Sequence, residues 1–363
     1  MIDRVERLAA LAAERQLDAL IVGDLVRPGD SGRSDMVNLR WLTGFAGTSG
    51  AAIVGPDSGL FITDFRYVDR VENEVEGLEL ARAERQLVPA IAERLEGRIG
   101  FDEAHTSVQV FERLEQLVPD SVELVPSAGM VEQLRRRKDA AEVARIREAA
   151  KVADEAYARA IEGGLAGRTE REVAATAAAA IRELGAEPSF PAIVAAGPNG
   201  ALPHAEPSDR EIGAGELIVF DMGAELDGYC SDCTRTFAAG EPEPDARDVY
   251  ELVLAAQTAS LEATSAGVGG KHVDAVARER ITAAGHGEEF GHGVGHGVGV
   301  EVHEAPRLGQ RSEDVLEAGD VVTIEPGVYV NGRFGVRIED LVVVTDEGYE
   351  NLSGLSKKLT VVG

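Results

Sequence analysis

Three of the seven histidines in the chain fall within one glycine-rich window, FGHGVGHGVGVEVHEAP at residues 290–306. They are His292, His296 and His303. Glycine lets a backbone pass close to a ligand, and imidazole groups bind metals and carry protons near neutral pH. Taken alone, the window also fits a glycine-rich loop whose histidines face solvent. With one histidine, four carboxylates elsewhere give the composition of a two-metal centre. These are Asp221, Asp232, Glu325 and Glu339.

The first two carboxylates belong to a predicted β-hairpin, GELIVFDMGAELDGYCSDCTRTFAAG, whose turn is Asp227-Gly228. Counting outward from this turn, Leu226 faces Tyr229 and Asp221 faces Thr234. Because residues two apart share a face of a strand, Asp232 should lie on the face of Thr234, diagonal to Asp221. A solvated face is the alternative, but the apolar run LIVF before Asp221 argues against it. Two buried acids on one face require a compensating cation.

The second pair has equally apolar surroundings. Glu325 ends the run VVTI, and Glu339 lies near Ile338 and Leu341. A buried, charged glutamate is costly unless it is paired or bound to metal. Four converging carboxylates without a metal would have to be partly protonated. Oxygen-rich ligation with a single imidazole suits manganese, cobalt or iron.

Two such ions, about 3.5–4 Å apart, can share a bridging hydroxide as nucleophile and polarise a substrate carbonyl. The remaining histidines can then donate to the developing oxyanion and move a proton to the leaving amine. This chemistry is the hydrolysis of an amide.

The elements that carry these residues divide into two parts. Residues 1 to about 133 alternate strand and helix patterns, which predicts an α/β unit with a mixed or parallel sheet. The glycines of GFAGTSG are expected to be turn residues, because this segment lacks the lysine of a phosphate-binding loop. Residues 134–161 predict one long helix, whose basic start, LRRRKD, is interpreted as a linker with a solvated face.

After this helix, the pattern predicts a second part made of helices around an antiparallel-rich sheet. A helix begins after Thr169, which forms a capping box with Glu172, and Gly185 follows it as a C-cap. A turn-rich loop carries His204. Helices are expected near 245–265 and 271–284, and strands fill most of the chain after residue 320.

The composition excludes several classes of partner. The net charge of −28 comes from 36 basic and 64 acidic residues spread along the chain, so nucleic acid and anionic membranes would be repelled. Such an acidic, lysine-poor surface suggests a halophilic protein that works in high salt, where screening relieves self-repulsion. The opening segment is amphipathic, unlike a secretory signal, and no apolar run reaches the ~20 residues of a membrane span. A cytoplasmic protein is expected.

The two cysteines, Cys230 and Cys233, form a CxxC motif. A redox role requires this motif at the start of a helix, and a four-cysteine zinc site requires a second pair. Here the motif lies in GYCSDCTRTF, which reads as a strand, and there is no second pair. Neither role is favoured.

Several motifs resemble the pita-bread metallopeptidase family, which holds Xaa-Pro aminopeptidase, Xaa-Pro dipeptidase (prolidase) and methionine aminopeptidase. They are FDMGAELDGYCSDCTRTF, HGVGHGVGVEVHEAP, TIEPGVYV and GVRIEDLVVVT. NLRWLTGFAGTSG, TDFRYVD and KDAAEVARIREA resemble the front of the proline-specific members. The resemblance implies a creatinase/prolidase-like α/β domain at 1–133 and an α+β pita-bread catalytic domain at 134–363. It also implies a homodimeric exopeptidase that cleaves Xaa-Pro bonds with two divalent ions, manganese or cobalt.

Residue by residue, the resemblance implies that Asp221, Asp232, His296, Glu325 and Glu339 are the metal ligands. Asp232 and Glu339 would bridge the two ions, and Glu325 would take the proton of the bridging water. His204, His292 and His303 would hold substrate and stabilise the tetrahedral intermediate, and Arg337 would support the site through hydrogen bonds. The remaining histidines match nothing in the family and are expected on the surface: His105, His272 and His286.

Methionine aminopeptidase and a non-catalytic relative remain as alternatives, whereas the presence of all five ligands argues against creatinase. Methionine aminopeptidase shares the ligand pattern, but it lacks the N-terminal domain. Creatinase shares the two-domain plan, but it works without metal and lacks this ligand set. Some relatives are non-catalytic peptide-binding proteins, and these characteristically lose ligands. The sequence leaves open the choice between dipeptides and longer peptides, the physiological metal and the oligomeric state.

Overall fold

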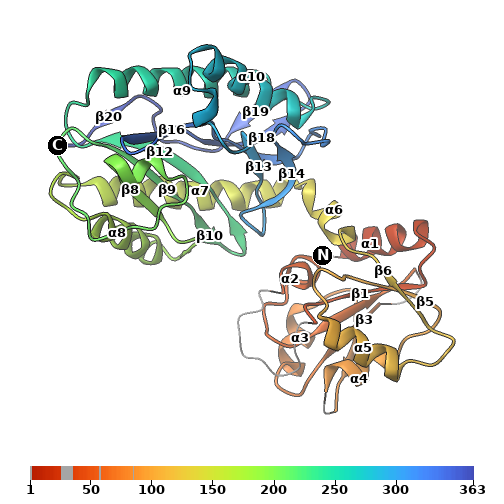
Figure 1. The fold of residues 1–363 in the computed structure, drawn as a ribbon. Helices are drawn as coiled ribbons and strands as arrows, with labels where there is room; N and C mark the ends of the chain where they lie inside the picture. Colours follow the sequence, from red (N-terminus) through yellow and green to blue (C-terminus); the bar gives the residue numbers. More distant parts are fainter. Residues whose placement is uncertain (1, 26–35, 57–58, 85) are drawn as a thin grey trace. The chain divides into compact units, whose positions relative to one another are not determined.

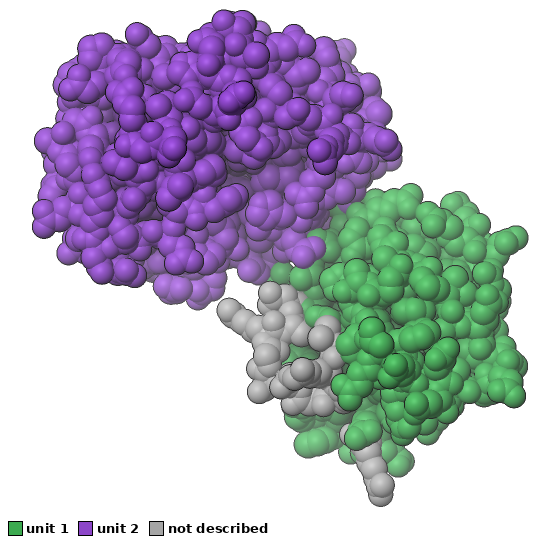
Figure 2. Space-filling model, viewed as in Figure 1, with its two compact units in different colours: residues 1–135 green, residues 136–363 purple. Residues whose placement is uncertain are grey.

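The computed structural model describes residues 2–25, 36–56, 59–84 and 86–363. The chain divides into two compact units, Met1–Arg135 (unit 1) and Arg136–Gly363 (unit 2), which Figure 2 colours green and purple. The sequence-based boundary at residues 133/134 falls inside the helix α6 (Met130–Arg136). Among the described residues, no helix is both long and apolar enough to cross a bilayer.

Unit 1 is built on a six-stranded mixed sheet, as its alternating pattern predicts. The strand order is β4 (Glu79–Arg82), β3 (Gly59–Thr63), β2 (Ala51–Val54), β1 (Ala19–Val22), β5 (Arg98–Phe101) and β6 (Glu123–Pro126). Strand β2 pairs antiparallel with both β1 and β3, whereas the other neighbouring pairs are parallel.

Six helices accompany this sheet among the described residues of the chain. They are α1 (Ile2–Glu14), α2 (Val37–Thr43), α3 (Val68–Glu74), α4 (Leu87–Ala92), α5 (Val108–Leu117) and α6. In the core, Ile91 of α4 and Leu114 of α5 pack in one cluster with Ile21, Ile62 and Ile99 of the strands. Phe101, the last residue of β5, belongs to the same cluster.

Unit 2 holds sheets between two pairs of helices (Figure 1). One pair is α7 (Ala140–Ile161) and α8 (Glu170–Glu183), and the other is α9 (Pro244–Glu262) and α10 (Gly270–Ala283). Tyr157 of α7 packs with Phe220 and Phe237 of the sheet on one side. Val253 of α9 joins a second cluster with Ile324 on the other side.

Four groups of strands form the sheets of unit 2, which is described without gaps. The four-stranded sheet runs β20 (Thr360–Val361), β12 (Cys233–Ala238), β9 (Leu217–Met222) and β8 (Ile193–Ala196). The five-stranded sheet runs β14 (Glu304–Leu308), β13 (Gly295–Gly297), β15 (Val321–Ile324), β18 (Asp340–Thr345) and β19 (Gly348–Asn351). Smaller sheets contain β11 (Tyr229–Cys230), β10 (Ala224–Leu226) and β7 (Glu187–Pro188), and β16 (Gly327–Val330) with β17 (Phe334–Arg337). Within unit 2 only β12 and β20 pair in parallel, so the prediction of an antiparallel-rich sheet is confirmed.

The capping signals of α8 are confirmed. The Thr169 hydroxyl accepts a hydrogen bond from the Glu172 amide, and the Glu172 carboxylate accepts one from the Thr169 amide. Gly185 follows the helix with φ of 85°, a conformation that favours glycine.

The single helix expected over 134–161 is wrong. Helix α6 ends at Arg136 and α7 begins at Ala140. Between them Asp139 takes extended backbone angles (φ −77°, ψ 172°) and caps α7, accepting from the amides of Ala141 and Glu142 at 2.8 Å. The local hydrogen bonds of a capping box therefore outweigh the helical periodicity that runs through this segment.

The solvated basic face expected for LRRRKD is also wrong. Arg136 makes two hydrogen bonds to the carboxylate of Asp320, at 3.1 and 2.8 Å. The Lys138 side chain is only 1% exposed, and its Nζ lies 3.2 Å from Glu304 Oε2. Arg137 is the exposed member of this group. These cations neutralise buried carboxylates whose positions in the sequence are remote.

Candidate metal centre

Five predicted site residues converge from five places in unit 2. Asp221 lies on β9 and His296 on β13; Asp232 precedes β12, Glu325 follows β15, and Glu339 lies between β17 and β18. One carboxylate oxygen from each of Asp221, Asp232 and Glu339 lies within 4.8 Å of the other two. His296 Nε2 lies 3.5 Å from Asp232 Oδ2 and 3.2 Å from Glu325 Oε1. The structure therefore brings all five groups together.

The predicted hairpin positions two of these carboxylates. Asp227 and Gly228 both have positive φ, 50° and 80°, as a tight hairpin turn requires. The register matches the prediction, with Leu226 opposite Tyr229 and Asp221 opposite Thr234.

The continuous strand expected through the CxxC motif is wrong, because Ser231 and Asp232 lie outside both β11 and β12. The ladder is interrupted where the hydroxyl of Ser231 accepts a hydrogen bond from the Ala224 amide at 3.0 Å. A Cβ at Gly223 would lie only 1.8 Å from the Ser231 carbonyl oxygen, so this close approach requires glycine. Because of this interruption, Asp232 is not paired in the sheet, and its carboxylate lies close to that of Asp221.

Burial makes the cluster electrostatically unfavourable on its own. Asp221, Asp232 and Glu339 are all buried. Burial, followed by repulsion from Glu339 and Asp221, raises the pKa of Asp232 well above its ordinary value. Burial and repulsion from Glu325 likewise raise the pKa of Glu339. Asp221 Oδ1 and Glu339 Oε1 are buried and have no hydrogen-bond partner in the part of the chain that the structure describes. Such oxygens are costly unless a cation meets them, so this donor set fits divalent ions.

The ring of His296 is held by a hydrogen bond to the backbone next to it. Its Nδ1 lies 3.0 Å from the Gly297 carbonyl oxygen, to which it donates. This hydrogen bond directs Nε2 toward Asp232 and Glu325, so either a proton or a metal ion on Nε2 would lie between the ring and these two carboxylates. Burial would raise the pKa of Glu325, but the hydrogen bond and charge of His296 lower it to about 2.

Arg337 forms hydrogen bonds with the cluster through Asp221. Its Nη2 donates to Asp221 Oδ2 at 2.6 Å, and its Nε donates to Thr234 Oγ1 at 2.9 Å. Its Nη1 donates to the Tyr329 hydroxyl at 3.0 Å and to the Pro203 carbonyl at 3.1 Å. The guanidinium is buried, and these hydrogen bonds fix the orientation of Asp221.

Tyr329 connects Arg337 to His292, and the sequence reasoning missed it. Its hydroxyl lies 2.9 Å from His292 Nε2, while His292 Nδ1 lies 2.8 Å from the Gly293 carbonyl. Burial lowers the pKa of His292, so its ring is neutral and accepts from the tyrosine. The sequence could have identified Tyr329, because it is the one polar side chain in the apolar strand GVYV and a buried hydroxyl requires a hydrogen-bond partner.

A cleft of about 1370 Å³ opens onto the cluster. Its lining includes all three predicted accessory histidines together with Asp221, Asp232, His296, Glu325 and Arg337. His204 and His303 are exposed to this cleft, and the His303 ring lies 4.3 Å from that of His296. Burial and the charge of His296 lower the pKa of His303 to about 4, so His303 is neutral near pH 7.

Glu304 is a second residue that the sequence reasoning missed. Besides its pairing with Lys138, its Oε1 accepts from the Glu301 amide at 3.0 Å. A Cβ at Gly299 would lie 2.6 Å from the same carboxylate. Glu304 therefore organises the backbone of the loop that carries His303. Its position directly after the candidate residue His303 is the feature of the sequence that could have identified it.

The histidines expected on the surface differ from one another. His272 is exposed, and His286 pairs with Glu289. For His105 the expectation is wrong, because its half-buried ring faces Asp102 and Glu132 in unit 1. Cys230 and Cys233 are buried and are not joined by a disulfide bond.

Comparison with known families gives two matches. Residues 144–346 match metallopeptidase family M24, and residues 4–137 match the creatinase/prolidase N-terminal domain. The chain is 33% identical to an Xaa-Pro dipeptidase of Pyrococcus furiosus over 383 residues, which covers 99% of this chain and 100% of that protein. It is 36% identical to the uncharacterized peptidase YqhT of Bacillus subtilis, with 99% and 100% covered.

Solved structures are equally similar. An Xaa-Pro dipeptidase from Bacillus anthracis superposes with a TM-score of 0.92 at 35% identity, and 99% of each chain is covered. An X-Pro aminopeptidase from Thermotoga maritima gives a TM-score of 0.87 at 32% identity, with 96% of this chain and 99% of that chain covered. These relatives share both units with the present chain.

Proposed function

Because the chain belongs to metallopeptidase family M24 and its N-terminal part matches the creatinase/prolidase domain, we propose that it hydrolyses Xaa-Pro peptide bonds. The substrate is an Xaa-Pro dipeptide or a peptide with proline as its second residue. The observation that carries the proposal is the convergence of one imidazole and four carboxylates at the base of an open cleft.

The proposed ligands of two divalent ions are Asp221, Asp232, His296, Glu325 and Glu339. Leaving Asp232 and Glu339 charged without a cation is especially costly, which supports their assignment as residues that would hold the ions. When bound, the ions supply Lewis acidity for the scissile carbonyl and lower the pKa of a water molecule. Manganese or cobalt is the proposed metal, since the donor set is rich in oxygen.

Glu325 is proposed to accept the proton of the attacking water. Its carboxylate lines the cleft beside the other proposed ligands, and Thr323 Oγ1 donates to its Oε1 at 3.1 Å. This hydrogen bond fixes the orientation of the carboxylate toward the cluster. His296 Nε2 lies 3.2 Å from the same carboxylate oxygen.

His303 is proposed to donate a hydrogen bond to the oxygen of the tetrahedral intermediate. The neutral imidazole keeps one N–H for this purpose, and the ring is exposed to the cleft. His204 lines the same cleft and is proposed to hold substrate. His292 and Arg337, joined through Tyr329, are proposed to position Asp221 and the adjoining wall of the site.

A side-by-side assay tests the proposal. Enzyme reconstituted with manganese or cobalt is offered an Xaa-Pro dipeptide, an Xaa-Pro-Yaa tripeptide and a Met-Ala peptide. Hydrolysis of either proline substrate with little attack on Met-Ala is expected, and the ratio of the first two separates dipeptidase from aminopeptidase activity. Preferential cleavage of Met-Ala would support a methionine aminopeptidase, and binding without turnover would support a non-catalytic relative.

A further inference from the structure

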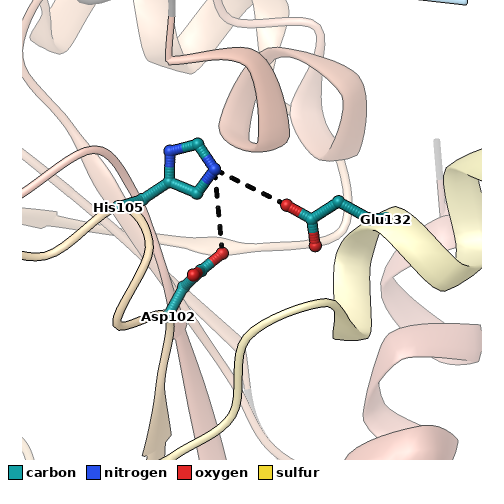
Figure 3. A group of neighbouring side chains, drawn as sticks. All are labelled: Asp102, His105 and Glu132. Carbon is teal, nitrogen blue, oxygen red and sulfur yellow. Dashed lines mark ion pairs between the residues drawn. The ribbon is translucent and has the colours of Figure 1, made fainter. Parts of the chain in front are cut away.

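A second group of metal-binding side chains lies in unit 1, apart from the proposed catalytic site. Figure 3 shows Asp102, His105 and Glu132 directed toward one another from two segments, the connection between β5 and α5 and the helix α6. Asp102 follows β5, His105 lies in the loop before α5, and Glu132 lies on α6. Hydrogen bonds between Leu25 and the 105–107 backbone hold this loop in place.

The spacing of the three side chains suits a single metal ion. His105 Nε2 lies 3.6 Å from Glu132 Oε1 and 4.0 Å from Asp102 Oδ2. One ligand atom from each residue lies within 4.8 Å of the other two. Because metal–ligand bonds to nitrogen and oxygen are about 2.0–2.2 Å long, ligand atoms around one ion are roughly 3–4.4 Å apart. Small rotations of these side chains would bring all three ligand atoms within bonding distance of one ion.

A buried hydrogen-bond network around Asn38 orients both carboxylates of this group. Asn38 Nδ2 donates to Glu132 Oε1 at 2.6 Å and approaches Asp102 Oδ2 at 3.4 Å. Arg135 Nη1 donates to Asn38 Oδ1 at 2.7 Å, which directs the NH₂ group of this amide toward the carboxylates. Asn38 and Arg135 are both buried. Supporting hydrogen bonds of this kind orient the carboxylates that bind metals in proteins.

Within the described part of the chain, the second carboxylate oxygen of Glu132 also lacks a partner, which a bound cation could provide. Glu132 Oε2 is buried and has no hydrogen-bond partner among the described residues. A buried carboxylate oxygen without a partner is uncommon and costly. The side chains of His105 and Glu132 are each 32% exposed, so an ion can enter and water can complete its coordination.

We propose that Asp102, His105 and Glu132 bind one divalent transition-metal ion, with zinc the best match to one imidazole and two carboxylates. The ion would join α6 to the end of β5 and to the loop before α5, and its role would be structural. This site is independent of the proposed peptidase function.

The test measures zinc binding to the full chain by equilibrium dialysis and elemental analysis. In a background of Asp232→Asn and Glu339→Gln, which disables the centre in unit 2, about one zinc ion per chain should remain bound. Adding His105→Gln should weaken this binding at least tenfold, whereas adding the exposed His272→Gln should leave it unchanged. Glu132→Gln is a second variant in case His105→Gln does not fold, as judged by circular dichroism.

X-ray absorption of the remaining zinc should show a mixed shell of nitrogen and oxygen ligands. Equal zinc content with and without His105→Gln or Glu132→Gln would overturn the proposal. So would the absence of zinc in the background protein, because a proton on His105 would then be the only cation shared by the two carboxylates. Neither result bears on hydrolysis by the wild-type chain.

Discussion

The two clusters of histidine and carboxylate differ in how their charge is balanced. In unit 2 four carboxylates surround one imidazole, and burial raises the pKa values of Asp232 and Glu339. In unit 1 two carboxylates face one imidazole that remains partly exposed. There the hydrogen bond to Glu132 raises the pKa of His105. Although burial opposes it, the hydrogen bonds from His105 and Asn38 lower the pKa of Glu132 to about 2.

This difference indicates what each cluster requires. In unit 1, one divalent ion would balance the charge of the two carboxylates, whereas one proton on His105 balances only half of it. The cluster in unit 2 holds more negative charge than one imidazolium and Arg337 can neutralise, so it requires divalent cations to be fully ionised. Dependence on metal should therefore be strong for unit 2 and modest for unit 1.

The largest effect is expected from Asp232→Ala. Loss of the central carboxylate should reduce bound metal in unit 2 and abolish hydrolysis of an Xaa-Pro peptide, by at least about 1000-fold in kcat/KM. Steady-state kinetics and elemental analysis measure the two quantities. Asp227→Asn is the matched control, since it changes an exposed aspartate in the turn of the same hairpin. Turnover by a metal-free Asp232→Ala protein would refute the mechanism.

Lys138→Met should destabilise the protein by about 3–5 kcal/mol, because it leaves Glu304 charged and buried without its cation. Chemical denaturation measures this loss. The double change Lys138→Met with Glu304→Leu should recover a large part of it, since both buried charges are then removed.

A double variant no more stable than the single one would show that Lys138 and Glu304 do not simply neutralise each other. Arg137→Met, at the exposed position next to Lys138, serves as the control and should change the free energy of unfolding little.

His303→Ala should lower kcat by about 100-fold, because one donor to the oxyanion is lost. Bound metal should hardly change, since the assigned ligands are all retained. Replacement of the exposed His272 by alanine gives the reference value. A fall in metal content that parallels the loss of turnover would show that the role assigned to His303 is wrong.

The metal-free protein should respond to pH in a way that follows from Asp232 and Glu339. Their raised pKa values mean that the folded chain keeps protons which the unfolded chain has already released above about pH 4. The contribution of these two groups to stability is therefore present at low pH and lost as pH rises through their folded pKa values.

In chelator at about pH 7, Asp232→Asn should consequently have a higher Tm than the wild type by a few degrees. Thermal unfolding at several pH values, with and without manganese, measures the difference. Metal should remove or reverse this advantage. An Asp232→Asn protein that is no more stable than the wild type in chelator would contradict the charge imbalance assigned to unit 2.

The smallest effect concerns the surface. With a net charge of −28, raising salt from about 0.1 M to about 2 M should raise Tm and support activity, because screening weakens repulsion between exposed carboxylates. The buried cluster in unit 2 should respond less. Equal Tm and equal activity at both concentrations would end the halophilic hypothesis.

The features that the sequence predicted correctly depend on near neighbours or on regular patterns. The turn at Asp227-Gly228 determines a register that places Asp221 opposite Thr234, and Thr169 with Glu172 begins α8. Strand and helix alternation predicted the mixed sheet of unit 1. The resemblance to the pita-bread metallopeptidases, and with it the two-part fold, is confirmed by the matches over both units.

The features that it missed depend on partners far away in the chain. Lys138 and Glu304 are 166 residues apart, and Arg136 and Asp320 are 184 apart, so LRRRKD looked solvated. His105 faces Glu132 across an intervening strand and helix. Tyr329 gains its importance only when folding brings it between His292 and Arg337. Periodicity within a segment carries no information about such contacts.

The most direct test of the two-metal account is to titrate manganese into chelated protein that carries His105→Gln. Hydrolysis of an Xaa-Pro dipeptide or tripeptide and metal bound per chain are followed together. The account predicts no turnover without metal and a rise to a plateau at about two ions per chain. Full turnover in the metal-free protein, or metal binding at unit 2 that never produces hydrolysis of either substrate, would contradict it.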